Sequence, residues 1–119
     1  MVTINAIESN HPPTATDNTV SVNEDNTFTF SAGDFNFSDI DPGDSLDRIQ
    51  ITSLETMGEL KLNGSDVTLG MEIQLGDIPN LTFTPGADDN SADYANFNFK
   101  VHDGTVYSLA AYSMTIDVI

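Results

Sequence analysis

The stretch of sequence best suited to chemistry is an acidic segment at residues 38–47, where a Pro-Gly pair places a sharp turn. Its four carboxylates belong to Asp39, Asp41, Asp44 and Asp47. Asp39 and Asp41, two positions apart on an extended backbone, are predicted to point the same way. Carboxylates that converge repel one another unless a proton or a cation lies between them. Because calcium prefers oxygen ligands, the segment predicts a calcium site, the alternative being an acidic, well-solvated turn.

The composition supports a cation as the ligand. The chain of 119 residues has 19 acidic and 3 basic residues, which gives a net charge of -16. Such a surface attracts cations and repels itself, and it excludes binding to nucleic acid or to an anionic membrane. Cysteine is absent, so disulfide and thiolate chemistry are excluded as well. Strong acidity without cysteine fits a secreted, extracellular bacterial protein that gains stiffness from metal.

The elements that must position these carboxylates are short strands. Apolar residues make up 39% of the chain, and they alternate with polar ones, a pattern that predicts half-buried strands. The predicted strands lie at 20–22, 28–30, 49–51, 60–62, 67–69, 73–75, 81–83, 97–101 and 112–118. Asn63-Gly64 predicts a hairpin. Turns about every 8–12 residues predict one all-β domain, a Greek-key β-sandwich of about seven to nine strands.

A short sequence motif occurs at both ends of the sequence. Thr3, Ile4, Asn5 and Ile7 match Thr115, Ile116, Asp117 and Ile119 at one constant offset. We therefore expect a tandem array, in which residues 1–9 are the tail and linker of a preceding repeat and residues 10–119 form one repeat.

Six motifs in order resemble the cadherin-like repeats of large bacterial surface proteins and adhesins. They are the linker at 10–15, the Glu-Asp turn at 22–25, the Phe-x-Asp-x-Asp loop at 37–41, and the strands at 58–64, 81–85 and 97–104. The resemblance implies an immunoglobulin/cadherin-like sandwich that binds calcium at the junctions between repeats. His11 departs from the pattern, because the family linker has aspartate there.

The alternation of loops between the two ends of a sandwich sorts the candidate calcium ligands into two poles. The entry pole, where the chain enters the domain, is predicted to hold Asn10, Asp39, Asp41, Asp44 and Asp103. The exit pole is predicted to hold Glu24, Asp25, Asp88, Asp89 and Asp93. Each pole offers only part of the six to eight oxygens that calcium takes, so neighbouring repeats are the expected partners that complete the sites.

Other chemistries fit less well. The Asp39 loop lacks the glycine and glutamate of an EF-hand, and His11 and His102, the latter expected to face solvent on a strand, are too few for zinc. Asp39 and Asp103 could form the carboxylate pair of a glycosidase, but without tryptophan or a long loop we expect no enzyme. The sequence thus predicts a calcium-stiffened spacer or adhesive module of a cell-surface protein, touching neighbouring repeats and, beyond them, surface polysaccharide or another adhesin. The alternative is a polysaccharide-binding module that uses Tyr94, Tyr107 or Tyr112.

Overall fold

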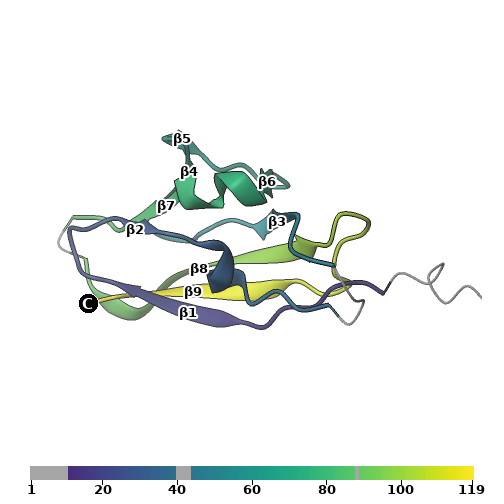
Figure 1. Ribbon diagram of the computed structural model, residues 1–119. Coiled ribbons are helices and arrows are strands. Elements are labelled where there is room, and N and C mark those ends of the chain that lie inside the picture. Colours follow the sequence, from purple (N-terminus) through teal and green to yellow (C-terminus); the bar gives the residue numbers. More distant parts are fainter. Residues whose placement is uncertain (1–10, 40–43, 88) are drawn as a thin grey trace, which may run out of the picture.

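The computed structural model describes residues 11–39, 44–87 and 89–119, which form two β-sheets packed face to face (Figure 1). The elements in chain order are β1 (Asn18–Val22), β2 (Phe28–Thr29), η2 (Ala32–Phe35), β3 (Arg48–Ser53), β4 (Glu59–Leu62), β5 (Ser65–Asp66), β6 (Glu72–Gln74), η3 (Leu75–Asn80), β7 (Leu81–Thr84), β8 (Ser91–His102) and β9 (Tyr112–Val118). The two η elements are short 3-10 helices. The prediction of an all-β sandwich is confirmed.

The larger sheet has the order β1-β9-β8-β3-β6, with the long strand β8 at its centre. All its pairs are antiparallel except β1 and β9, which run side by side in the same direction. The predicted Greek-key β-sandwich has antiparallel neighbours, so this parallel pair was not predicted from the sequence. Its register places Val20 opposite Ile116 and Val22 opposite Val118, and all four side chains are buried.

The smaller sheet has the order β2-β7-β4-β5 and contains the predicted hairpin. Asn63 and Gly64 lie between β4 and β5 with φ of 52° and 81°, the left-handed conformation that a tight hairpin turn requires. The second strand of the hairpin is β5 at Ser65–Asp66, directly after the turn, and the strand predicted at 67–69 is not formed. Leu69, expected on the buried face, is 67% exposed, so this part of the prediction is wrong. The chain turns at Gly70, just before β6, and the Gly70 amide donates to the carbonyl of Ile51 on β3 at 2.8 Å.

The core between the sheets is built from alternate side chains of the strands and a cluster of aromatic rings. Five phenylalanines are almost fully buried: Phe30, Phe35, Phe83, Phe97 and Phe99. Phe99 meets Phe35 edge to face at 4.9 Å, and Phe30 meets Phe97 at 5.7 Å in the same way. Edge-to-face ring pairs stabilise the fold beyond what the burial of their apolar surface contributes. The other two phenylalanines, Phe28 and Phe37, are partly buried and pack against this core.

Strand direction defines the two poles. β1, β9 and β3 begin at the entry pole, on the right in Figure 1, and β8 ends there. β1 and β9 end at the exit pole, on the left, where β8 begins. The predicted tail at residues 1–9 lies outside the described residues and stays a prediction.

Candidate metal centre at the entry pole

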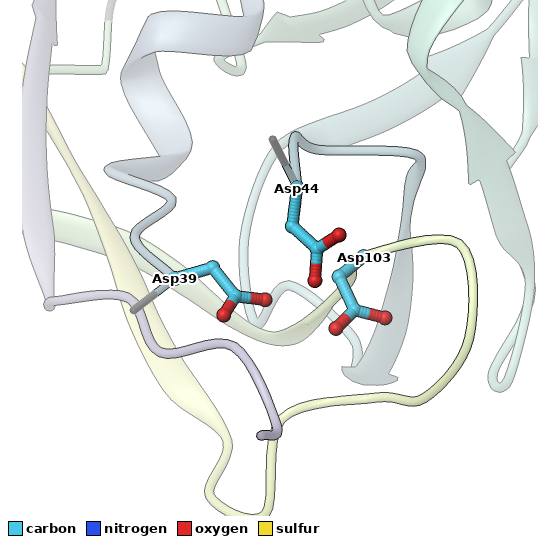
Figure 2. Close-up of side chains that lie close together, drawn as sticks. All are labelled: Asp39, Asp44 and Asp103. Carbon is cyan, nitrogen blue, oxygen red and sulfur yellow. The ribbon is translucent and has the colours of Figure 1, made fainter. Parts of the chain in front are cut away.

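Three aspartates from distant parts of the sequence converge at the entry pole. Asp39, Asp44 and Asp103 each bring a carboxylate oxygen to within 4.8 Å of those of the other two (Figure 2). Asp39 and Asp44 come from the segment that leads into β3, and Asp103 follows β8. Carboxylate oxygens at this spacing can surround one cation, and the hard ions calcium and magnesium are the ones that such ligands suit.

Asp39 is placed by the chain segment that enters the domain. Thr14 and Ser38 exchange two backbone hydrogen bonds of 2.7 Å, which tie the entering segment to the residue just before Asp39. Upstream, η2 is followed by its cap residue Asn36, which takes the left-handed conformation that commonly ends a helix. The buried ring of Phe35 anchors this helix in the core. Asp39 is therefore held by backbone contacts at a defined place.

Asp103 is the most enclosed member of the cluster, with 8% of its surface exposed. Its Oδ1 accepts hydrogen bonds from the amides of Thr105, at 2.8 Å, and Val106, at 2.9 Å. Its own amide donates to the Val106 carbonyl at 3.2 Å. The carboxylate thus closes the turn at the end of β8, and this turn fixes the direction in which it points.

Asp44 is held by the residues that follow it. The amide of Asp47 donates to the His102 carbonyl at 2.8 Å, so that this segment lies along the end of β8 beside Asp103. Leu46, two residues after Asp44, is buried in the hydrophobic core. One carboxylate oxygen of Asp44 and one of Asp39 are shielded from solvent. Negative charges that are close together and removed from water repel strongly, and a bound cation offsets this repulsion.

The other ligands predicted for the entry pole, Asn10 and Asp41, lie outside the described residues, as does Asp88 of the exit pole. Their roles stay predictions. The described part of the entry pole therefore supplies Asp39, Asp44 and Asp103 from the predicted set.

The four described candidates of the exit pole are spread out. Within residues 11–39, 44–87 and 89–119, they form no group with the spacing needed to hold a metal. Glu24 lies beside the C-terminal residue, because its amide donates to the Ile119 carbonyl at 2.7 Å. Asp25 and Asp93 have left-handed backbones, with φ of 66° and 52°. Asp89 accepts a hydrogen bond of 2.7 Å from the Tyr94 hydroxyl. Their roles as ligands stay predictions.

A shallow pocket of about 360 Å³ opens beside these exit-pole residues. Its lining consists of Met57, Asp89, Asn90, Ser91, Asp93 and Tyr94. The Tyr94 hydroxyl, besides donating to Asp89, accepts a hydrogen bond of 3.1 Å from the amide of Gly86. Tyr94 is only 7% exposed, so most of its side chain lies in the core.

A polar network beside the cluster of Asp39, Asp44 and Asp103 was not predicted from the sequence. Arg48 Nε donates to Asp47 at 2.7 Å, and its Nη1 lies 3.6 Å from Glu72. Glu72 in turn accepts a hydrogen bond from the Tyr107 hydroxyl. This network joins the turn that carries Asp103 to β3 and β6. The adjacency of Asp47 and Arg48 was the one available signal, but Glu72 and Tyr107 are distant in sequence.

His102 was predicted to face solvent, and this prediction is wrong. The residue is 8% exposed, because the ring of Tyr107 packs against it with 4.5 Å between centroids. Its Nδ1 accepts the amide hydrogen of Gly104 at 2.9 Å and lies 3.7 Å from the Asp47 carboxylate.

Tyr107 gives a prediction about alkaline pH. Burial, and then the hydrogen bond to the Glu72 carboxylate, raise the pKa of Tyr107 above its usual value of about 10. The stability that this shift contributes is fully present below the unfolded pKa and is lost as pH rises above it. We expect Tyr107→Phe to cost at most about 1 kcal/mol at pH 7, because the lost hydrogen bond is exposed to solvent.

When the pH is raised from 9 to 11, the free energy of unfolding should therefore fall less in Tyr107→Phe than in the parent, because the variant has no Tyr107 hydroxyl to ionise. Urea unfolding at these two pH values measures the difference. Tyr94 does not confuse the comparison, since it is the same in both proteins. An equal loss in both proteins would contradict the assigned environment of Tyr107.

The predicted sugar-binding tyrosines do not form an exposed aromatic surface in the described residues. Tyr94 is buried, and Tyr107 is half-buried with its hydroxyl on Glu72. Tyr112 is also half-buried and packs on Phe99 with 6.0 Å between ring centroids. A sugar-stacking platform needs an open aromatic face, and these three side chains do not supply one.

Comparison with known proteins gives one match. A family model described as a bacterial Ig domain matches residues 10–116. No curated protein and no solved structure matches the chain. In the described residues, no helix has the length and apolar character needed to cross a membrane.

Proposed function

The chain belongs to the bacterial Ig domain family, and we propose that it is a calcium-stiffened, cadherin-like repeat of a long secreted cell-surface protein. Domains of this family are typically non-enzymatic structural modules and often occur on extracellular surface proteins. On this proposal the repeat is a spacer that holds an adhesive surface away from the cell, or is itself adhesive. Neighbouring repeats of the same chain are its first partners.

The convergence of Asp39, Asp44 and Asp103 is the observation that supports calcium. Three carboxylates within 4.8 Å carry three negative charges in a domain whose net charge is already -16. Calcium reduces this repulsion, and it tolerates the irregular arrangement of ligands that loops provide. Magnesium fits less well, because it demands near-ideal octahedral geometry and gives up its waters reluctantly.

The position of the cluster supports a role at a junction. Asp39 follows directly on the residue that pairs with Thr14, so the cluster lies where the chain enters the domain. A cation bound there would link the entering segment to the β3 and β8 ends of the sandwich. It would thereby reduce the freedom of the domain to swing on its linker, which is the stiffening that we propose.

The first experiment follows calcium binding residue by residue. We expect a calcium titration of the ¹⁵N-labelled chain to shift amide NMR signals around Asp39, Asp44 and Asp103, with a Kd of about 10⁻⁴–10⁻³ M, the weak range of extracellular modules. Asp44→Asn should weaken binding about tenfold, which corresponds to ~1.4 kcal/mol. In chelator this variant should be as stable as the parent or slightly more stable, since one repelling charge is gone.

Asp66→Asn is the matched control, because Asp66 is an exposed aspartate on β5, outside the cluster. It removes the same charge and should leave the calcium affinity within about twofold, as expected for a screened charge at a distance. Equal weakening by both substitutions would show only a response to net charge. If Asp44→Asn binds calcium as the parent does, the assignment of the ligand is wrong.

A further inference from the structure

The exposed apolar side chains of this acidic domain gather at its two poles. Seven large hydrophobic residues are exposed in the described part of the chain. Three lie at the entry pole, namely Leu75, Val106 and Leu109. Two lie at the exit pole, namely Met57 and Ile119. The remaining two lie between the poles, because Leu54 follows Ser53, which is opposite Asn98 within β8, and Leu69 precedes Gly70, whose amide donates to Ile51 within β3. Single exposed apolar residues are ordinary, but groups at both ends of a repeat point to contact surfaces.

The apolar residues of the entry pole are placed by the contacts of the metal centre. The amide of Leu75 donates to the Asp47 carbonyl at 2.9 Å, which sets Leu75 beside the start of β3. Val106 belongs to the turn that Asp103 closes, and Leu109 follows in the same connection to β9, the yellow-green loop at the right of Figure 1. Leu109 is 85% exposed, the highest value among the large hydrophobic residues.

The apolar residues of the exit pole are also placed by defined contacts. The amide of Ile119 donates to the Val22 carbonyl at 2.8 Å, so the chain continues beside the end of β1, and its side chain is 67% exposed. Met57 lines the exit-pole pocket with Asp89 and Ser91, and it is 49% exposed. Both poles thus present apolar side chains rimmed by carboxylates.

We propose that the entry pole of one repeat packs against the exit pole of the preceding repeat, with Leu109 seated against Ile119 and Met57. This proposal rests on the tandem organisation in the proposed function, and it adds a direct protein contact to the calcium site. Two different surfaces at opposite ends of one unit make a head-to-tail contact, which continues from unit to unit as an array requires. The committed partner is therefore a second copy of this domain, joined in series.

The length of the linker supports this partner. The match between Ile7 and Ile119 leaves six residues, 8–13, between the end of one repeat and Thr14, where the next chain segment pairs with Ser38. Six residues span at most about 21 Å when fully extended, and two of them are prolines. So short a connection keeps the exit pole of one repeat facing the entry pole of the next.

The test uses a chain of two repeats, made by appending residues 8–119 after Ile119 of the parent, with ¹⁵N relaxation to measure tumbling. Packed poles should make both repeats tumble as one body in calcium, with a correlation time roughly twofold or more above that of a single repeat, whereas free domains move independently. Leu109→Ser in the second repeat should return the correlation time toward the single-repeat value. Ile119→Ser in the first repeat should do the same from the other side.

Leu69→Ser in the second repeat is the matched control, since Leu69 is also exposed but lies between the poles. It should leave the tumbling unchanged. Independent tumbling of the parent repeats in calcium, joint tumbling that survives Leu109→Ser, or an equal loss with Leu69→Ser would each overturn the proposal.

Calcium binding is measured separately by the NMR titration of the single chain, so that the proposed calcium site and the proposed contact between poles are tested independently. If the Asp44 signals respond to calcium but Leu109→Ser changes nothing, the apolar contact is wrong and the calcium site stands. If the parent repeats tumble together in chelator, lose this with Leu109→Ser, and show no calcium response, the contact stands and the calcium site is wrong.

Discussion

Phe99→Ala is expected to lower the free energy of unfolding by about 3–5 kcal/mol, the largest effect of any substitution considered for this domain. Phe99 lies on the central strand β8, has no exposed surface, and meets the rings of Phe35 and Tyr112. Removing its ring leaves a cavity that the two sheets cannot close without losing their own pairing. The loss should be the same in calcium and in chelator, because Phe99 is none of the candidate calcium ligands Asp39, Asp44 and Asp103.

Urea unfolding measures this loss, as a lower midpoint with an unchanged slope. Leu69→Ala is the control, since that side chain is 67% exposed and its truncation should change stability by no more than about 0.5 kcal/mol. If the Phe99→Ala loss were no greater than that of Leu69→Ala, the packing of β8 between the sheets would be wrong.

The sequence predicted the strands well where burial alone decides the pattern. Phe97, Phe99 and Val101 alternate with polar residues on β8, and the structure buries all three. Asn63-Gly64 predicted its hairpin because few residues other than glycine and asparagine adopt positive φ readily. The meeting of Asp39 with Asp103 was expected from the alternation of loops between the poles, which depends only on strand direction.

The sequence failed where distant residues decide the outcome. The direction of β1 and β9 was predictable, but not that these strands would be neighbours and hence parallel. The strand pattern predicts that His102 faces solvent, but in the structure the ring of Tyr107 packs over it. Arg48, Glu72 and Tyr107 form one network only because β3, β6 and the turn after β8 meet at the entry pole. Local periodicity carries no information about such contacts.

The second large expected effect, after that of Phe99→Ala, is that calcium raises the melting temperature of the domain. A ligand that binds only the folded state stabilises it by mass action, and 10 mM calcium with a Kd of 10⁻⁴–10⁻³ M gives about 1.4–2.7 kcal/mol. For a domain of this size, this corresponds to a rise of about 5–10 °C. Calcium also offsets the repulsion among Asp39, Asp44 and Asp103, which the net charge of -16 increases.

Two controls separate site binding from general screening. Calcium and chelator samples need equal ionic strength, because any salt weakens the repulsion between exposed charges. Magnesium at the same concentration should raise the melting temperature less, because it releases its waters reluctantly.

Whether the entry-pole aspartates hold calcium can be tested by the melting temperatures of the parent and of Asp44→Asn in calcium and in chelator. We expect a rise of about 5–10 °C in the parent and a clearly smaller rise in Asp44→Asn, with the variant at least as stable as the parent in chelator. Equal melting of the parent in calcium and in chelator at matched ionic strength would contradict this expectation.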